Sequence, residues 1–221
     1  IYPMDLSKDR ERLYVAATKE HPTQRDLYAI ELESGTMTRL TSEAGSYESA
    51  AVSDDATHAL ATFADFGAPR ELVAIDVAAG TQTQLSDAHP EEAHALTAFV
   101  PEYFEYENRH GQVIHGHLFK PDDWTKDDAR PLLIYVYGGP LGTRKMATRG
   151  AYQAASYFFA YYMAKVHGYV TCTIDPRGAS GYGGLFEKSN YEQVGKPQVE
   201  DLVDGARHFV EHYGVDAARI G

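Results

Sequence analysis

Two stretches near the N-terminus alternate apolar and polar positions and repeat each other. Residues 27–32 (LYAIEL) recur 45 positions later as residues 72–77 (LVAIDV), and each is followed by a Gly-Thr turn. A polar turn and another short apolar run precede each copy, at 13–16 and 59–62. The unit predicts strand, polar loop, strand, glycine hairpin and strand, at the repeat length of a propeller blade. A small antiparallel sheet that happens to repeat is the alternative.

The pattern changes at about residue 98. Residues 104–107 and 113–119 alternate as two strands joined by a turn-rich linker, which predicts a hairpin. Longer apolar runs at 132–137 and 169–174 predict buried strands, with a mostly helical aromatic segment near 152–165 between them. Strands that alternate with helices favour a parallel sheet. We therefore expect two domains, residues 1–97 and 98–221.

A final helix is predicted from residue 199 to about 213. Its apolar positions recur at helical spacing and predict a core-facing stripe centred near Ala206 and Val210, formed by Val199, Leu202, Val203, Ala206, Phe209, Val210 and Tyr213. The chain then reaches Arg219-Ile220-Gly221, where we expect another strand to begin. That strand should cover the edge of the strand ending at Tyr137.

Composition narrows the class of protein. Of 221 residues, 43% are hydrophobic, and 32 Asp and Glu against 20 Lys and Arg give a net charge of −12. This balance disfavours nucleic acid and anionic membrane surfaces as partners. The single cysteine, Cys172, excludes an internal disulfide and a multi-cysteine metal site. No apolar run reaches the length of a transmembrane helix. Localisation cannot be read from the sequence, and we expect an upstream segment because no initiator methionine opens the chain.

Three ordered motifs carry a family resemblance. They are Tyr135-Val136-Tyr137-Gly138-Gly139-Pro140, then Asp175-Pro176-Arg177-Gly178-Ala179-Ser180-Gly181-Tyr182-Gly183-Gly184, then the helix opened by Val199-Glu200-Asp201 and ending before Val215-Asp216-Ala217-Ala218-Arg219-Ile220-Gly221. Together they resemble the prolyl oligopeptidase family of serine peptidases, most closely its dipeptidyl peptidase IV branch. The resemblance implies the last blades of a β-propeller, followed by the N-terminal half of the parallel-type sheet of an α/β hydrolase.

The resemblance also implies an activity and one site residue. It implies a serine exopeptidase that acts through an acyl-enzyme and releases N-terminal dipeptides with Pro or Ala in the penultimate position. Tyr137 would donate to the oxyanion through its hydroxyl, in a turn shaped by Gly138, Gly139 and Pro140. The triad cannot be assigned, because no serine fits Gly-x-Ser-x-Gly: Ser180 has Gly178 before it but Tyr182 after it.

The resemblance leaves partners and alternatives open. The expected partners are a peptide substrate, the remainder of the same polypeptide and a second copy in a homodimer, and no cofactor or metal is implied. We expect the chain alone to be inactive and to aggregate or dimerise. Acylaminoacyl peptidase and oligopeptidase activity remain open, as does a non-catalytic fragment that serves as a binding scaffold.

Other candidate groups favour structural roles. His208, Glu211 and His212 match the inverted zinc-peptidase motif, but they fall outside the predicted core stripe and are expected in solvent. His115 and His117 could form a pair of metal ligands, but no third ligand is identifiable. We interpret Glu91-Glu92 as a charged linker rather than as a site for the amino terminus of a peptide. Asp175 and Arg177 are expected to contribute to an ion pair.

Overall fold

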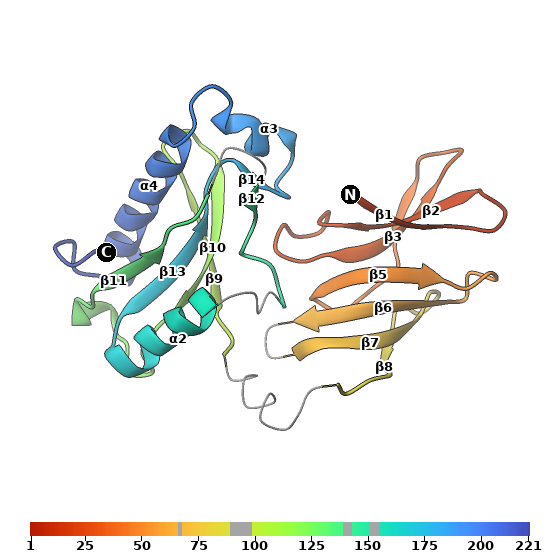
Figure 1. The fold of residues 1–221 in the computed structure, drawn as a ribbon, viewed down its shortest axis with the longest axis horizontal. Helices are drawn as coiled ribbons and strands as arrows, with labels where there is room; N and C mark the ends of the chain where they lie inside the picture. Colours follow the sequence, from red (N-terminus) through yellow and green to blue (C-terminus); the bar gives the residue numbers. More distant parts are fainter. Residues whose placement is uncertain (66–67, 89–98, 139–142, 151–154) are drawn as a thin grey trace. The chain divides into compact units, whose positions relative to one another are not determined.

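The computed structural model describes residues 1–65, 68–88, 99–138, 143–150 and 155–221 (Figure 1). The chain divides into two compact units, Ile1–Val100 with Thr148–Tyr152, and Pro101–Ala147 with Gln153–Gly221. The predicted boundary at residues 97 and 98, the Glu91-Glu92 pair and the start of the predicted helix near residue 152 lie outside the described residues.

The first unit contains two four-stranded antiparallel sheets. One pairs β1 (Tyr2–Leu6), β2 (Arg12–Ala17), β3 (Asp26–Glu31) and β4 (Met37–Arg39) in chain order; the other pairs β5 (Ser46–Val52), β6 (His58–Asp65), β7 (Ala68–Asp76) and β8 (Gln82–Gln84) in the same way. Gly35 and Gly80 have φ of 71° and 69° in the two β-hairpins, as the repeated glycine predicts. Four-stranded antiparallel sheets of this kind are typical of propeller blades.

The first strand of each sheet, β1 and β5, was not predicted. Both strands are irregular: the pairing register shifts between Pro3 and Asp5 in β1, and between Glu48 and Ala51 in β5. Ser49 within β5 has a positive φ of 52°. Because a bulge displaces every following side chain to the other face, the alternation of apolar and polar residues is lost along these two strands.

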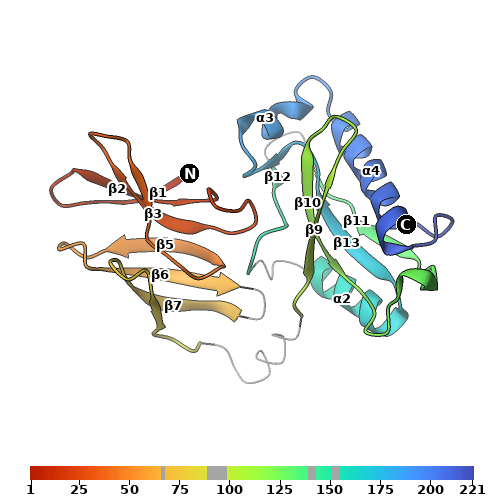
Figure 2. The ribbon, with the colours of Figure 1, turned by 180° about the vertical axis from the view of Figure 1, so that it is seen from behind.

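A mixed sheet forms the centre of the second unit. Its order is β11 (Leu132–Tyr135), β13 (Val170–Asp175), β10 (Val113–Phe119) and β9 (Glu102–Glu107). Only β11 and β13 pair in parallel, whereas β10 pairs antiparallel with both β13 and β9. The expectation of a parallel sheet was therefore incomplete: the short connection of the β9–β10 hairpin, visible in Figure 2, requires β9 and β10 to pair antiparallel, and β10 also runs antiparallel to β13.

Short elements complete the second unit. They are the 3₁₀ helices η2 (Lys126–Asp128) and η3 (Lys188–Asn190), the two-residue strands β12 (Thr143–Arg144) and β14 (Ala179–Ser180), and the one-turn helix α3 (Gly184–Glu187). At the position where the sequence predicts another strand, the structure has a single parallel bridge: Ile220 bridges to Leu132, and the amide of Gly221 donates to the Leu132 carbonyl.

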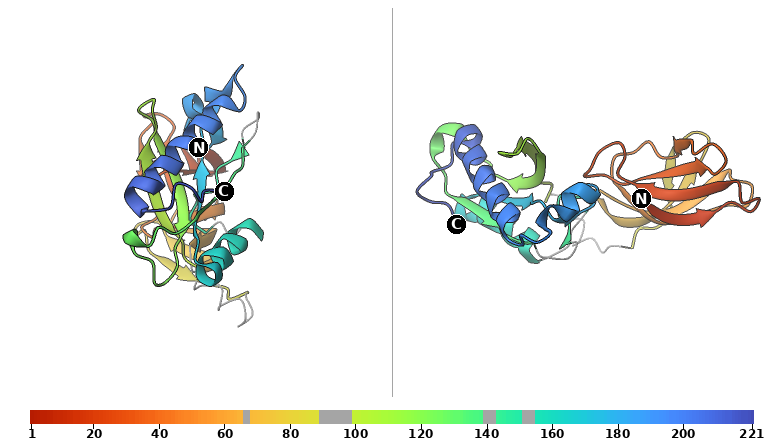
Figure 3. Two further views of the ribbon diagram at one scale, coloured as in Figure 1. Left: turned by 90° about the vertical axis from the view of Figure 1, so that its left-hand side faces the viewer. Right: turned by 90° about the horizontal axis from the view of Figure 1, so that it is seen from above.

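Two helices cover opposite faces of the mixed sheet. Tyr157 of α2 (Ala155–His167) contacts His117 and Phe119, while Phe209 of α4 (Lys196–Tyr213) contacts Phe104. Figure 3 shows α4 along its side of the sheet. The core on this side contains Phe104, Tyr106, Ile114, Leu118, Leu132, Val170, Cys172, Ile174 and Phe209. No helix in the described ranges is both long and apolar enough to cross a membrane.

The buried face of α4 differs from the predicted stripe. Val199 and Val203 are exposed, whereas Asp201, Gly205 and Phe209 are buried. Two features explain why the buried face of α4 is rotated relative to the predicted stripe. Asp201 is held inside by hydrogen bonds, and Gly205 has no side chain, so the helix approaches the sheet closely there. A stripe defined by apolar residues alone misses both, because one position is charged and the other is glycine.

Candidate active site

Tyr137 lies two residues beyond β11, at the edge of the sheet where the parallel strands β11 and β13 end. Its hydroxyl donates a hydrogen bond to the carboxylate of Asp175, the last residue of β13. Gly138 follows with φ of 147°, which favours glycine at the start of the turn. Gly139 and Pro140, which the sequence also places in this turn, lie outside the described residues.

Asp175 is completely buried and accepts four hydrogen bonds from residues that the structure describes. Oδ1 accepts from the Tyr137 hydroxyl and, at 2.8 Å, from the amide of Met146. Oδ2 accepts from the Tyr182 hydroxyl and, at 3.0 Å, from the amide of Ala147. Every donor that the described residues supply is uncharged, so hydrogen bonds rather than an opposite charge offset the desolvation of this carboxylate.

Burial also keeps both phenols protonated. It is the main cause of a raised pKa at Tyr137 and at Tyr182, and the charge of Asp175 adds to it. Burial raises the pKa of Asp175 as well, although its hydrogen bonds oppose that shift. Near neutral pH the two tyrosines are therefore hydrogen-bond donors. A neutral hydroxyl at this edge of the sheet can donate to negative charge that develops on a bound ligand.

Tyr182 is a residue of this site to which the sequence patterns assign no role. It lies in the glycine-rich loop from Gly178 to Gly184. In the structure the loop returns the Tyr182 hydroxyl to Asp175, seven residues earlier in the chain. Ser180 lies in β14, which pairs with β12. The sequence feature that could have indicated this contact is a tyrosine in a glycine-rich loop that follows a strand ending in aspartate.

Arg177 pairs with α4 rather than with Asp175. Its Nε lies 2.9 Å from Asp201 Oδ1, and its Nη2 lies 2.9 Å from Glu200 Oε2. Asp201 also accepts from the side-chain amide of Asn108, in the β9–β10 turn. This buried network ties the loop after β13 to α4 and the hairpin. The two residues proposed for one ion pair thus have separate partners.

The histidine candidates lie in packing positions. Glu211 and His212 are exposed as expected, but His208 is half-buried against Phe104 and Tyr106. His115 stacks on Tyr182 with ring centroids 5.3 Å apart, and His117 is buried beside Tyr157. Among the residues that the structure describes, no group of three or more His, Cys, Asp or Glu is placed to hold a metal ion.

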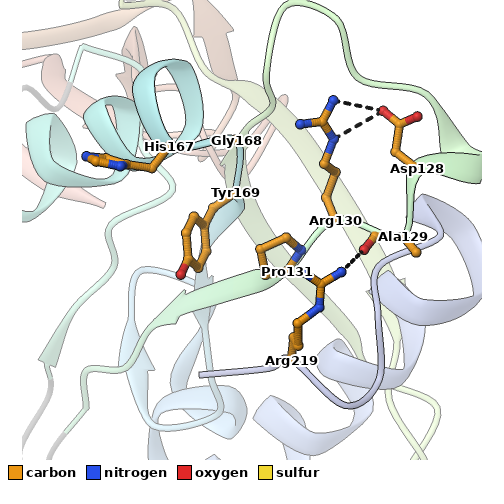
Figure 4. Close-up of a pocket in the computed structure, with 8 residues that line it drawn as sticks. All are labelled: Asp128, Ala129, Arg130, Pro131, His167, Gly168, Tyr169 and Arg219. Carbon is orange, nitrogen blue, oxygen red and sulfur yellow. Dashed lines mark hydrogen bonds and ion pairs between the residues drawn. The ribbon is translucent and has the colours of Figure 1, made fainter.

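A hollow of about 480 Å³ opens at the opposite end of the parallel strands (Figure 4). It is lined by Asp128, Ala129, Arg130, Pro131, His167, Gly168, Tyr169 and Arg219. Arg130 is paired with Asp128, and Arg219 donates to the carbonyl of Ala129 at 2.6 Å. The chain's own acceptors therefore already engage both guanidinium groups, and the Tyr137 edge remains the stronger candidate site.

Comparisons with known proteins agree with this geometry. Residues 155–221 match the model of the prolyl oligopeptidase family, and residues 1–70 match that of the dipeptidyl peptidase IV N-terminal region. Human dipeptidyl peptidase 8 is 25% identical over 99% of this chain and 25% of its own length. Probable dipeptidyl peptidase 4 of Emericella nidulans is 29% identical over 98% of this chain and 28% of its own length.

A solved structure shares the fold. The crystal structure of Porphyromonas gingivalis dipeptidyl peptidase 4 superposes with a TM-score of 0.80 at 20% identity, over 99% of this chain and 30% of that one. The fold is thus that of a β-propeller combined with an α/β hydrolase. The chain spans between a quarter and a third of the length of the curated relatives it matches. Two family models in order along one chain, and relatives that align over nearly all of it, support the similarity of this chain to the prolyl oligopeptidase family of peptidases, near its dipeptidyl peptidase IV branch.

Proposed function

We propose that the protein containing this chain is a serine exopeptidase that cleaves peptide bonds through an acyl-enzyme and releases N-terminal dipeptides, with Pro or Ala in the penultimate position. The observation that carries the proposal is Tyr137, whose hydroxyl is held at the C-terminal edge of β11 in a chain similar to this family. The names of the human and Emericella relatives support the dipeptidyl specificity.

The chain contributes two parts to this function. Residues 1–97 are the last blades of the propeller, and residues 98–221 are the N-terminal half of the hydrolase domain. The serine, histidine and aspartate of the triad belong to other residues of the whole protein, since no serine here fits the nucleophile motif. A homodimer is the assembly we propose.

Tyr137 has a defined chemical role in this proposal. Attack of the serine on the scissile carbonyl converts its oxygen into an oxyanion, and a preorganised donor near that oxygen lowers the barrier. The hydroxyl of Tyr137 supplies this donor, because its raised pKa keeps the proton on the phenol. Gly138 follows Tyr137 with a positive φ of 147°, as expected at the start of a turn that leads the backbone away from the site.

The test uses the whole protein and the chromogenic substrate Gly-Pro-p-nitroanilide. Tyr137→Phe should lower kcat by about 10² to 10³ with little change in KM, as loss of an oxyanion donor does. The matched control is Tyr106→Phe, which removes another buried phenolic hydrogen bond, to the carbonyl of Asp201, on the α4 side of the sheet. An unchanged kcat in Tyr137→Phe would remove the oxyanion role.

The same assay separates the alternative activities. Cleavage of acetyl-Ala-p-nitroanilide in place of Gly-Pro-p-nitroanilide would identify an acylaminoacyl peptidase. Cleavage of only internally placed Pro bonds in longer peptides would identify an oligopeptidase. A whole protein that cleaves none of these substrates would favour the non-catalytic scaffold.

A further inference from the structure

We propose that Asp175 and Tyr182 are positioning residues for Tyr137: the carboxylate holds the Tyr137 hydroxyl when no oxyanion is present, and Tyr182 keeps that carboxylate hydrogen-bonded when Tyr137 turns to the oxyanion. The inference rests on the proposed oxyanion role of Tyr137. It assigns a task to a buried carboxylate and a second tyrosine that the oxyanion chemistry itself does not use.

The argument begins with the single proton of a phenol. In the structure the Tyr137 hydroxyl donates that proton to Asp175 Oδ1. A hydroxyl has one proton to donate, so it cannot serve Asp175 and an oxyanion fully at the same time. Donation to the oxyanion therefore requires the hydroxyl to leave Asp175. No proton is transferred in this step, because the phenol keeps its proton and only the acceptor changes.

Release of Tyr137 has a cost that the surroundings of Asp175 reduce. A completely buried carboxylate without donors is strongly unfavourable. When Tyr137 turns away, Asp175 keeps the amide of Met146 on Oδ1, and the Tyr182 hydroxyl and the amide of Ala147 on Oδ2. Since Tyr182 uses the other oxygen, its bond does not compete with that of Tyr137. Three donors remain, which lowers the cost of switching acceptors.

Tyr182 is held in place independently of Tyr137. Its ring stacks on His115 at 5.3 Å with an interplanar angle of 6°, and lies 5.0 Å from the ring of Phe186. The Lys145 ammonium lies 4.8 Å from the centre of the same ring. These contacts involve the ring and not the hydroxyl, so phenylalanine at this position keeps them. Tyr182→Phe is therefore a variant that removes one hydrogen bond and preserves the packing.

The experiment is a double-mutant cycle in the whole protein with Gly-Pro-p-nitroanilide. Tyr182→Phe should lower kcat by about tenfold or more, the scale of one hydrogen bond to a charged group, and leave KM unchanged. In the Tyr137→Phe background, Tyr182→Phe should cause no further loss of kcat, because Tyr182 acts only through the Tyr137 hydroxyl. Tyr106→Phe is the control for loss of a buried phenolic hydroxyl, and thermal midpoints of all variants are compared with it.

The outcomes separate the inference from the proposed function. If Tyr137→Phe lowers kcat while Tyr182→Phe does not, or if the two losses multiply, the oxyanion role stands and the positioning role is wrong. If Tyr137→Phe leaves kcat unchanged, both fail. A loss of kcat in Tyr182→Phe that is matched by Tyr106→Phe would indicate general destabilisation and would also overturn the inference. A loss confined to kcat, and absent without the Tyr137 hydroxyl, supports it.

Discussion

His117 is a buried histidine that makes no catalytic contact in this arrangement. It lies on β10 against Tyr157 of α2, and its Nδ1 has no hydrogen-bond partner among the described residues. Burial lowers the pKa of His117 from 6.5 to about 4. The imidazole is therefore neutral in the folded protein at pH values where the unfolded chain would already bind a proton.

This histidine predicts a loss of stability in acid. Between about pH 6.5 and pH 4 the unfolded state binds a proton at His117 and the folded state does not. The contribution of the neutral imidazole to the free energy of unfolding is therefore full above pH 6.5 and declines as the pH falls towards 4. His117→Leu should flatten the decrease of the denaturation midpoint across this window. The exposed His58, replaced as His58→Leu, is the control. Parallel pH profiles for wild type and His117→Leu would contradict the prediction.

At the scale of elements, the contact between α4 and the sheet depends on a glycine. A Cβ at Gly205 would lie 2.4 Å from Ile174 Cδ1 and 2.9 Å from the Tyr106 hydroxyl oxygen. Neither neighbour can move easily, since Ile174 is fully buried and the Tyr106 hydroxyl is bonded to the carbonyl of Asp201. The rotation of α4 away from its apolar stripe thus follows from close packing at this position.

Gly205→Ala should therefore destabilise the protein. Overpacking costs about 1–3 kcal/mol, more than the gain of up to about 1 kcal/mol from the better helix former. Denaturant titration should give a lower midpoint for the variant. Gly184→Ala at the start of α3, where a Cβ would meet nothing within 4 Å, is the matched control. A midpoint that rises in Gly205→Ala would mean that the helix does not approach the sheet this closely.

At the scale of the whole chain, apolar side chains of the second unit are exposed. On α2, Phe159 and Val166 are 55% and 62% exposed, and Val136 beyond β11 is 63% exposed. A helix that is apolar on nearly every face normally packs on more than one side. Exposed apolar residues that lie close together favour association. These surfaces belong to a chain about a quarter to a third as long as its relatives.

The isolated 221-residue chain should consequently self-associate. Sedimentation velocity at low and high concentration should show dimers or larger species whose fraction grows with concentration. Replacing Phe159 and Val166 together by lysine should shift the distribution towards monomer, while Leu185→Lys on α3 should not. A monodisperse monomer that unfolds cooperatively would contradict this prediction.

Sequence patterns predicted the features that depend on neighbours along the chain. Alternation and glycine turns located six of the eight strands that the structure describes in the first unit, and apolar runs located β11 and β13. Tyr137 was identified as a candidate site residue by the resemblance of its motif to a known family, not by the periodicity of the sequence. The two missed strands, β1 and β5, contain bulges that break the local pattern on which such predictions depend.

What the sequence determined by itself was the order and type of most elements and the family resemblance, because local periodicity and short motifs are encoded in contiguous residues. Tertiary structure alone decided which polar groups meet. Tyr137 and Asp175 are 38 positions apart, Asn108 and Asp201 are 93 apart, and Tyr182 reaches Asp175 only through the path of its loop. Such contacts depend on how strands and helices pack, and burial then sets the pKa of each group and the cost of leaving it unpaired.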